Sequence, residues 1–147
     1  ITIDLEVTTT SNNWKQSLSG NAPFNGVDLR GTTKSDFTGK YDYYFWCNRA
    51  DTGTNITNDY DDWLNTASNI GRRDNLCDYA TPGTYKAKII VKQGTHYAQD
   101  QATVTVGGTL GATITANPTS GVTPLYVVLT GGATGTQTGT INYSFWY

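Results

Sequence analysis

The chain carries one aromatic segment twice, and this internal repeat limits the folds it can adopt. Thr38–Cys47 aligns with Thr138–Tyr147, and Val27–Gly31 aligns with Val127–Gly131. The offset is 100 residues in both cases. The aromatic residues that recur are Tyr43, Phe45 and Trp46, as Tyr143, Phe145 and Trp146. Several identities at one constant spacing indicate a duplicated structural unit.

A period near 100 residues is too long for a solenoid repeat and has the size of an immunoglobulin-like β-sandwich. Because the chain has 147 residues, it has room for one complete copy and part of another. We therefore predict a complete sandwich over residues 1–106, a hinge over residues 107–111, and the N-terminal part of a second sandwich over residues 112–147.

Alternation of apolar and polar residues supports an all-β class with antiparallel sheets. It runs through Ile1–Val7, Tyr41–Trp46, Tyr85–Lys92 and Ala102–Val106, and it predicts that Lys86, Lys88 and Lys92 lie on an outer face. Glu6 is the only Glu and Met is absent, which disfavours a helical bundle.

The alternation stops between Asn48 and Asp74. Asp51–Asn58 has the composition of turns, because Asp, Asn and Gly favour turn conformations. We predict a short helix over Asp59–Ala67, with Trp63 and Leu64 packed inward.

The two cysteines, Cys47 and Cys77, are either a disulfide or two buried thiols of a cytosolic protein. An even number of cysteines suits an oxidising compartment, so we predict a bridge. A bridge across a loop of about 30 residues would add roughly 3–4 kcal/mol by the loop-entropy model.

Three segments resemble polycystic-kidney-disease (PKD) type domains. Tyr79–Val91 is similar to a characteristic strand of that family, Ala116–Val127 to its opening, and Thr140–Phe145 to its third strand. Phe45–Gly53 departs from the family, which usually continues that strand with a Trp-Asp-Phe-Gly-Asp-Gly motif. The resemblance implies a seven-stranded, immunoglobulin-like sandwich in tandem repeats of secreted bacterial or archaeal surface proteins, and it implies no catalytic residues.

The residues themselves offer little for catalysis or for nucleic acid. His96 is the only histidine and lies in a turn-like segment, so a nucleophile–histidine site is disfavoured. A net charge of −2 gives no broad attraction to nucleic acid, and no apolar run reaches the ~18 residues of a membrane helix. We expect a non-enzymatic protein without a cofactor.

Several residues remain candidates for binding or modification. Calcium binding by Asp51, Asp59 and Asp61 is the alternative to solvated turn residues, since calcium prefers oxygen ligands. Trp14 and Trp63 are candidate contacts for a partner or a glycan. Trp14 could equally belong to local packing. Asn55 and Asn142 begin glycosylation sequons.

Two functions follow from these observations. The first is a structural or adhesive module of an extracellular stalk, filament or cell-surface protein. Its partial second domain would be completed by further chain or by a neighbouring subunit, because a few strands with an apolar face are not stable alone. The alternative is a carbohydrate-binding or spacer module of a secreted hydrolase.

Overall fold

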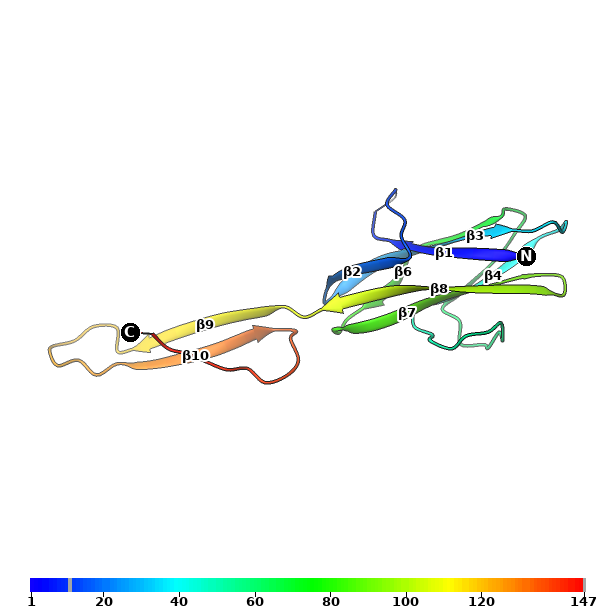
Figure 1. Ribbon diagram of the computed structural model, residues 1–147. Coiled ribbons are helices and arrows are strands. Elements are labelled where there is room, and N and C mark those ends of the chain that lie inside the picture. Colours follow the sequence, from blue (N-terminus) through cyan, green and yellow to red (C-terminus); the bar gives the residue numbers. More distant parts are fainter. Residues whose placement is uncertain (11, 147) are drawn as a thin grey trace. The chain divides into compact units, whose positions relative to one another are not determined.

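The computed structural model describes residues 1–10 and 12–146, and these residues form strands and no helix. The prediction of an all-β fold with antiparallel sheets is confirmed. The chain divides into two compact units, Ile1–Gly107 and Gly108–Tyr147, called here the first and the second unit (Figure 1).

The first unit has eight strands among its described residues. They are β1 (Thr2–Thr8), β2 (Ser17–Asn21), β3 (Phe24–Lys34), β4 (Tyr41–Trp46), β5 (Asp62–Thr66), β6 (Ile70–Tyr79), β7 (Gly83–Gln93) and β8 (His96–Gly107). One sheet has the order β1-β3-β6 and the other β2-β8-β7-β4-β5. Neighbouring strands are antiparallel except β2 and β8, which are parallel.

The two sheets share one apolar core, in which β1 contacts β7 and β8, and β3 contacts β7. Alternate side chains of each strand enter this core, as the period of two requires. The fully buried apolar side chains of this core are Leu5, Val7, Val27, Leu29, Tyr43, Phe45, Ala87, Ile89, Val91 and Val104.

The helix predicted over Asp59–Ala67 is wrong, because the middle of this segment, Asp62–Thr66, forms strand β5. It pairs with β4, so that Trp63 lies opposite Tyr44, and the Trp63 side chain is 45% exposed rather than packed inward. Pairing with β4 satisfies the backbone hydrogen-bonding groups of β5, although the residues of β5 show little alternation of apolar and polar side chains. Tertiary pairing here overrides a local preference.

Lys88 lies on the outer face of its sheet, as expected, but it is not exposed to solvent. Strand β7 is central, flanked by β4 and β8, and Lys88 is fully buried. Its Nζ donates to the backbone oxygen of Asp51 at 2.8 Å and to Asp51 Oδ2 at 3.0 Å. The loop that follows β4 covers this lysine, and the sequence pattern of β7 alone carries no information about that loop.

The second unit contains one antiparallel pair, β9 (Leu110–Asn117) and β10 (Val128–Gly135). Strand β9 begins within the segment expected as a hinge, residues 107–111. The strand expected over Thr140–Phe145 is absent, since these residues have no ladder partner in the described part of the unit. The first copy of that segment, β4, is held between β5 and β7.

The pairing of β9 with β10 repeats that of β1 with β3. Leu5 lies opposite Gly31 in the first unit, and Ile114 lies opposite Gly131 in the second. The end pairs Thr8–Asp28 and Asn117–Val128 correspond in the same way. The second unit therefore reproduces one strand pair of the first with a shorter connection.

Candidate functional site

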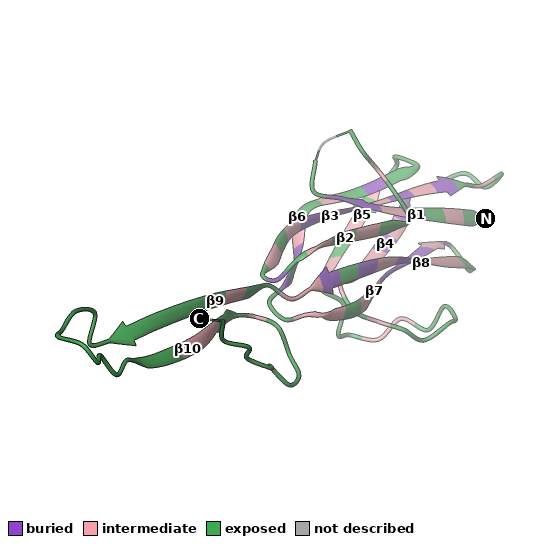
Figure 2. Ribbon diagram, turned by 60° about the vertical axis from the view of Figure 1, so that its left-hand side comes forward, coloured by how far each residue is buried: buried purple, intermediate pink, exposed green. Residues whose placement is uncertain are grey.

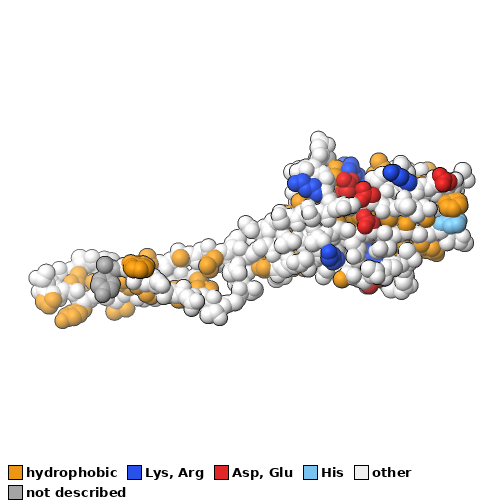
Figure 3. Space-filling view, viewed as in Figure 1, with side chains coloured by type: hydrophobic (Ala, Val, Ile, Leu, Met, Phe, Trp, Pro, Cys, Tyr) orange, Lys and Arg blue, Asp and Glu red, His pale blue; other side chains and the backbone are white. Residues whose placement is uncertain are grey.

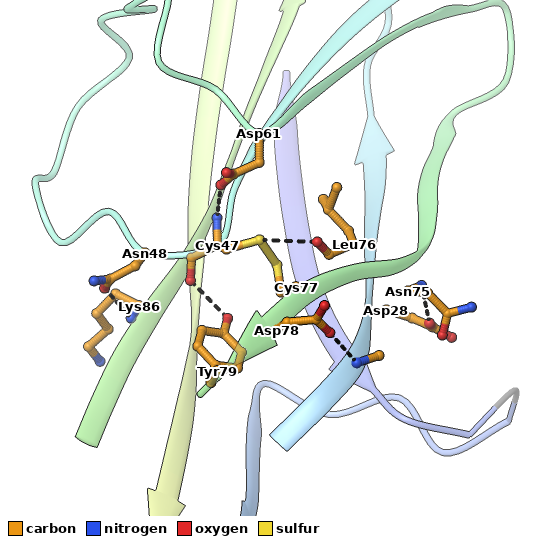
Figure 4. Close-up of a disulfide and its surroundings, with 11 residues drawn as sticks. Asp28, Cys47, Asn48, Asp61, Asn75, Leu76, Cys77, Asp78, Tyr79 and Lys86 are labelled. Carbon is orange, nitrogen blue, oxygen red and sulfur yellow. Dashed lines mark hydrogen bonds between the residues drawn. A yellow bond between two sulfur atoms is a disulfide. The ribbon is translucent and has the colours of Figure 1, made fainter. Parts of the chain in front are cut away.

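The two cysteines form a disulfide that joins the sheets of the first unit. Cys47 follows β4 and Cys77 lies in β6, with their Cα atoms 5.4 Å apart. Around the bridge, the Tyr79 hydroxyl donates to the Cys47 carbonyl at 2.8 Å, and the Cys47 amide donates to Asp61 at 2.6 Å (Figure 4). Burial, and then the nearby Asp61 carboxylate, raise the pKa of Tyr79, which keeps its hydroxyl protonated as a donor.

A network of charges anchors the loop between β4 and β5. The Arg49 guanidinium lies 4.4 Å from the ring centre of Trp46 and donates to Asp51 at 2.5 Å and to the Asn55 carbonyl at 2.8 Å. Hydrogen bonds from Arg49 and Lys88 lower the pKa of Asp51 to about 2. This loop is therefore a folded cover over the outer face of β4 and β7.

The three calcium candidates point their carboxylates at donors of the protein. Asp51 accepts from Arg49 and Lys88, Asp59 from Thr57 and Trp46, and Asp61 from the Cys47 amide. The hydrogen bond from Thr57, followed by that from Trp46, lowers the pKa of Asp59. Within residues 1–10 and 12–146, no group of three or more potential metal ligands converges.

The two tryptophan candidates lie on different sheets. Trp14 is half-buried, with the guanidinium carbons of Arg30 and Arg72 at 4.4 and 5.1 Å from its ring centre, so it packs on the outside of β3 and β6. Trp63 lies on edge strand β5, next to Tyr44 in the adjacent strand. The structure does not bring them together into one binding surface.

The remaining sequence candidates are exposed. Asn55 lies in the β4–β5 loop and Asn142 lies outside any strand. The Thr57 hydroxyl of the first sequon accepts a hydrogen bond from Arg49 at 3.0 Å. The His96 ring stacks on Phe37, with ring centres 3.8 Å apart.

The second unit has an exposed apolar surface whose residues were not predicted from the sequence. One face of the β9–β10 pair, the exposed apolar face, consists of Ala112, Ile114, Ala116, Leu129, Gly131 and Ala133. Ile114 is 64% exposed and Leu129 37%. Most of β9 and β10 has the colour of exposed residues in Figure 2. Tyr143 and Phe145 lie over part of this face and border a groove of about 200 Å³ with Ile114 and Gly131.

The second unit also carries no charged side chain. All 10 Lys and Arg, all 12 Asp and Glu, and the one His lie in residues 1–107. In Figure 3, coloured charges lie only over the first unit. The plain sequence contains this signal, because residues 108–147 have no Asp, Glu, Lys, Arg or His.

Comparison with protein families, with curated proteins and with solved structures found no match to this chain. Among the described residues, no helix has the length and apolar character needed to cross a membrane.

Proposed function

We propose that this chain is a non-enzymatic structural or adhesive module of an extracellular stalk, filament or cell-surface protein. In this role the second unit is completed by strands from further chain or from a neighbouring subunit. The observation that carries the proposal is the repeated strand pair, whose apolar face is buried in the first unit and exposed in the second.

The topology of the first unit supports an immunoglobulin-like sandwich of the PKD type. Its three- and five-stranded sheets enclose one core, and the chain passes from β1 in one sheet to β2 at the edge of the other. Facing antiparallel sheets with edge strands of this kind are common in extracellular domains of about 100 residues.

The disulfide supports an extracellular location. Such bonds persist in oxidising environments and are rare in the cytosol of most organisms. The bridge ties the long β4–β5 loop to the opposite sheet, which suits a module that must keep its shape outside the cell.

The test is the assembly state of the purified chain, measured by sedimentation velocity and negative-stain electron microscopy. We expect ordered assemblies that Ile114→Lys abolishes, because the lysine places a charge on the exposed apolar face. Ile70→Lys is the matched control, since Ile70 is 43% exposed in the first unit. A chain that stays monomeric at every concentration would contradict completion of the second unit by a neighbouring subunit.

One observation favours the alternative of a carbohydrate-binding module. Trp63 and Tyr60 are 45% and 37% exposed, and the ring of Tyr60 meets that of Tyr44 edge-on, with centres 5.4 Å apart. Exposed aromatic rings are suited to stacking on sugars. Calorimetric titration with polysaccharides, using Trp63→Ala and Trp14→Ala, tests this function; binding lost only in Trp63→Ala would support it.

A further inference from the structure

We propose that the free edge of β10 binds an uncharged, extended strand of another polypeptide, antiparallel to β10, with a glycine in register with Gly131. This inference rests on the proposed function and specifies the chemistry of the strand that completes the second unit.

The first unit provides the template for this strand. There β3 pairs with β1 on one edge and with β6 on the other, and Gly31 of β3 lies in register with Gly71 of β6. A Cβ atom on Gly71 would lie 2.4 Å from Cγ of Tyr43, which real contacts do not allow. The Tyr43 ring therefore requires glycine in the strand that pairs beside Gly31.

In the second unit, β9 and β10 correspond to β1 and β3, and no described strand corresponds to β6. Strand β10 pairs with β9 on one edge, and no described residue pairs with its other edge. Gly131 takes the place of Gly31, and Tyr143 is the repeat counterpart of Tyr43.

The aromatic side chains of the second unit lie over Gly131 itself. A Cβ atom there would be 3.0 Å from Cζ of Phe145 and 3.2 Å from Cδ1 of Tyr143. In the first unit the corresponding space above Gly31 is filled by Ile89, whose Cδ1 would be 2.4 Å from such a Cβ. An incoming strand with glycine beside Gly131 would accept the Tyr143 ring, as β6 accepts that of Tyr43.

The distribution of charged side chains on the edge strands indicates that the partner strand is uncharged. Charged side chains on edge strands oppose pairing with other chains, and the first unit has them on β1 (Asp4, Glu6) and β6 (Arg72, Arg73, Asp74). Strands β9 and β10 have none. A charged strand added here would find no counter-ion, and its loss of hydration beside an apolar face would cost far more free energy than that of an uncharged strand. Binding of this strand is therefore expected to depend little on salt.

A synthetic peptide tests the proposal on the full chain. The probe has the sequence of Ile70–Tyr79 with Arg72, Arg73, Asp74 and Asp78 replaced by Thr and Cys77 by Ser. The matched control peptide carries Val in place of its glycine. Hydrogen exchange is followed at the amides of β10 and of β3, and affinity is measured by titration at about 50 mM and about 1 M salt, which differ strongly in screening.

We expect the glycine peptide to protect β10 amides and leave β3 unchanged. The valine peptide should bind at least about ten-fold more weakly, a difference of about 1.4 kcal/mol. Equal affinity of the two peptides, protection confined to β3 or β9, or an affinity that falls steeply with salt would overturn the proposal.

These results are distinguishable from those for the proposed function. Glycine-selective binding at β10 by a chain that never assembles would support the strand site and contradict assembly through a neighbouring subunit. Ordered assemblies in which β10 amides still exchange freely would support the structural role and contradict the strand site.

Discussion

The strand pair β1–β3 and its copy β9–β10 have the same register but opposite surroundings. Leu5 is fully buried opposite Gly31, whereas Ile114 is 64% exposed opposite Gly131. Both pairs present an apolar face, so the pairing itself does not decide burial. The opposing sheet does, and in the first unit β7 and β8 supply it. The comparison teaches that a repeat can conserve pairing while its environment differs.

The outer faces of the two strand pairs differ in charge. At matching positions, Glu6 and Arg30 form an ion pair at 2.5 Å in the first unit, whereas Thr115 faces Thr130 in the second. The first unit is thus adapted to water on its outer surface. The second unit replaces ions by hydroxyls, which can be covered at a much smaller desolvation cost.

The aromatic segments give the largest expected difference between the units. Tyr43 is fully buried over Gly71, while Tyr143 is 52% exposed. Tyr43→Ala should lower the free energy of unfolding of the first unit by about 3–5 kcal/mol, as large core truncations do. Tyr143→Ala should change stability by less than about 0.5 kcal/mol. Urea denaturation of both variants measures this, and equal losses would mean that Tyr143 is buried in solution.

Removal of the disulfide should weaken only the first unit. We expect Cys47→Ser combined with Cys77→Ser to cost about 3–4 kcal/mol, because the unfolded chain gains freedom when the loop is opened. Thermal denaturation measures the loss. Hydrogen exchange of β9 and β10 serves as the control, since the second unit contains no cysteine. Faster exchange there would show that the units are coupled.

The paired glycines sharpen the comparison further. Gly71→Ala should cost about 1–3 kcal/mol, because its Cβ would overlap the buried ring of Tyr43 and overpacking strains the core. Gly131→Ala should cost less than about 0.5 kcal/mol, since the neighbouring Phe145 ring is 45% exposed and can move. Denaturant titration compares them. A larger loss for Gly131→Ala would refute the view that the second unit is open.

The smallest expected effect is the change in stability of the first unit at acid pH. Since the pKa of Asp51 is lowered to about 2 in the folded state, its ionised form stabilises the first unit above the ordinary value of 3.8. This contribution is lost as the pH falls from about 4 to about 2, when the carboxylate is protonated. Asp51→Asn should reduce the pH dependence of stability in that window. An unchanged profile would show that the Arg49 and Lys88 contacts are absent in solution.

The second unit provides the internal control for the acid experiment. Residues 108–147 contain no Asp, Glu or His, so the exchange of their amides should show no structural transition over the same pH range. A transition there that persists when the C-terminal carboxyl group is amidated would indicate contact with titrating groups of the first unit.

Much of the first unit could be predicted from local patterns. Alternation identified the apolar faces of β1, β4, β7 and β8, since the period of two follows from strand geometry. It missed β2 and most of β6, where Gly71 is followed by Arg72 and Arg73, and it misread β5 as a helix. These strands are specified by the neighbours with which they pair.

The candidate surfaces were predicted less well. The sequence carried the repeat and the absence of charge after Gly107, but it could not tell which copy of the apolar face is covered. It also named Trp14 and Trp63 as candidate contacts without showing that they pack against different sheets.

By itself, the amino-acid sequence determined the all-β class, the internal repeat and the apolar faces of β1, β4, β7 and β8, because these follow from local periodicity and identity. Only the tertiary structure decided that Lys88 is buried under a loop, that the disulfide joins two sheets, and that Ile114 is exposed where Leu5 is not. The physical reason is that burial depends on the elements packed against a residue, and these lie far from it in the chain.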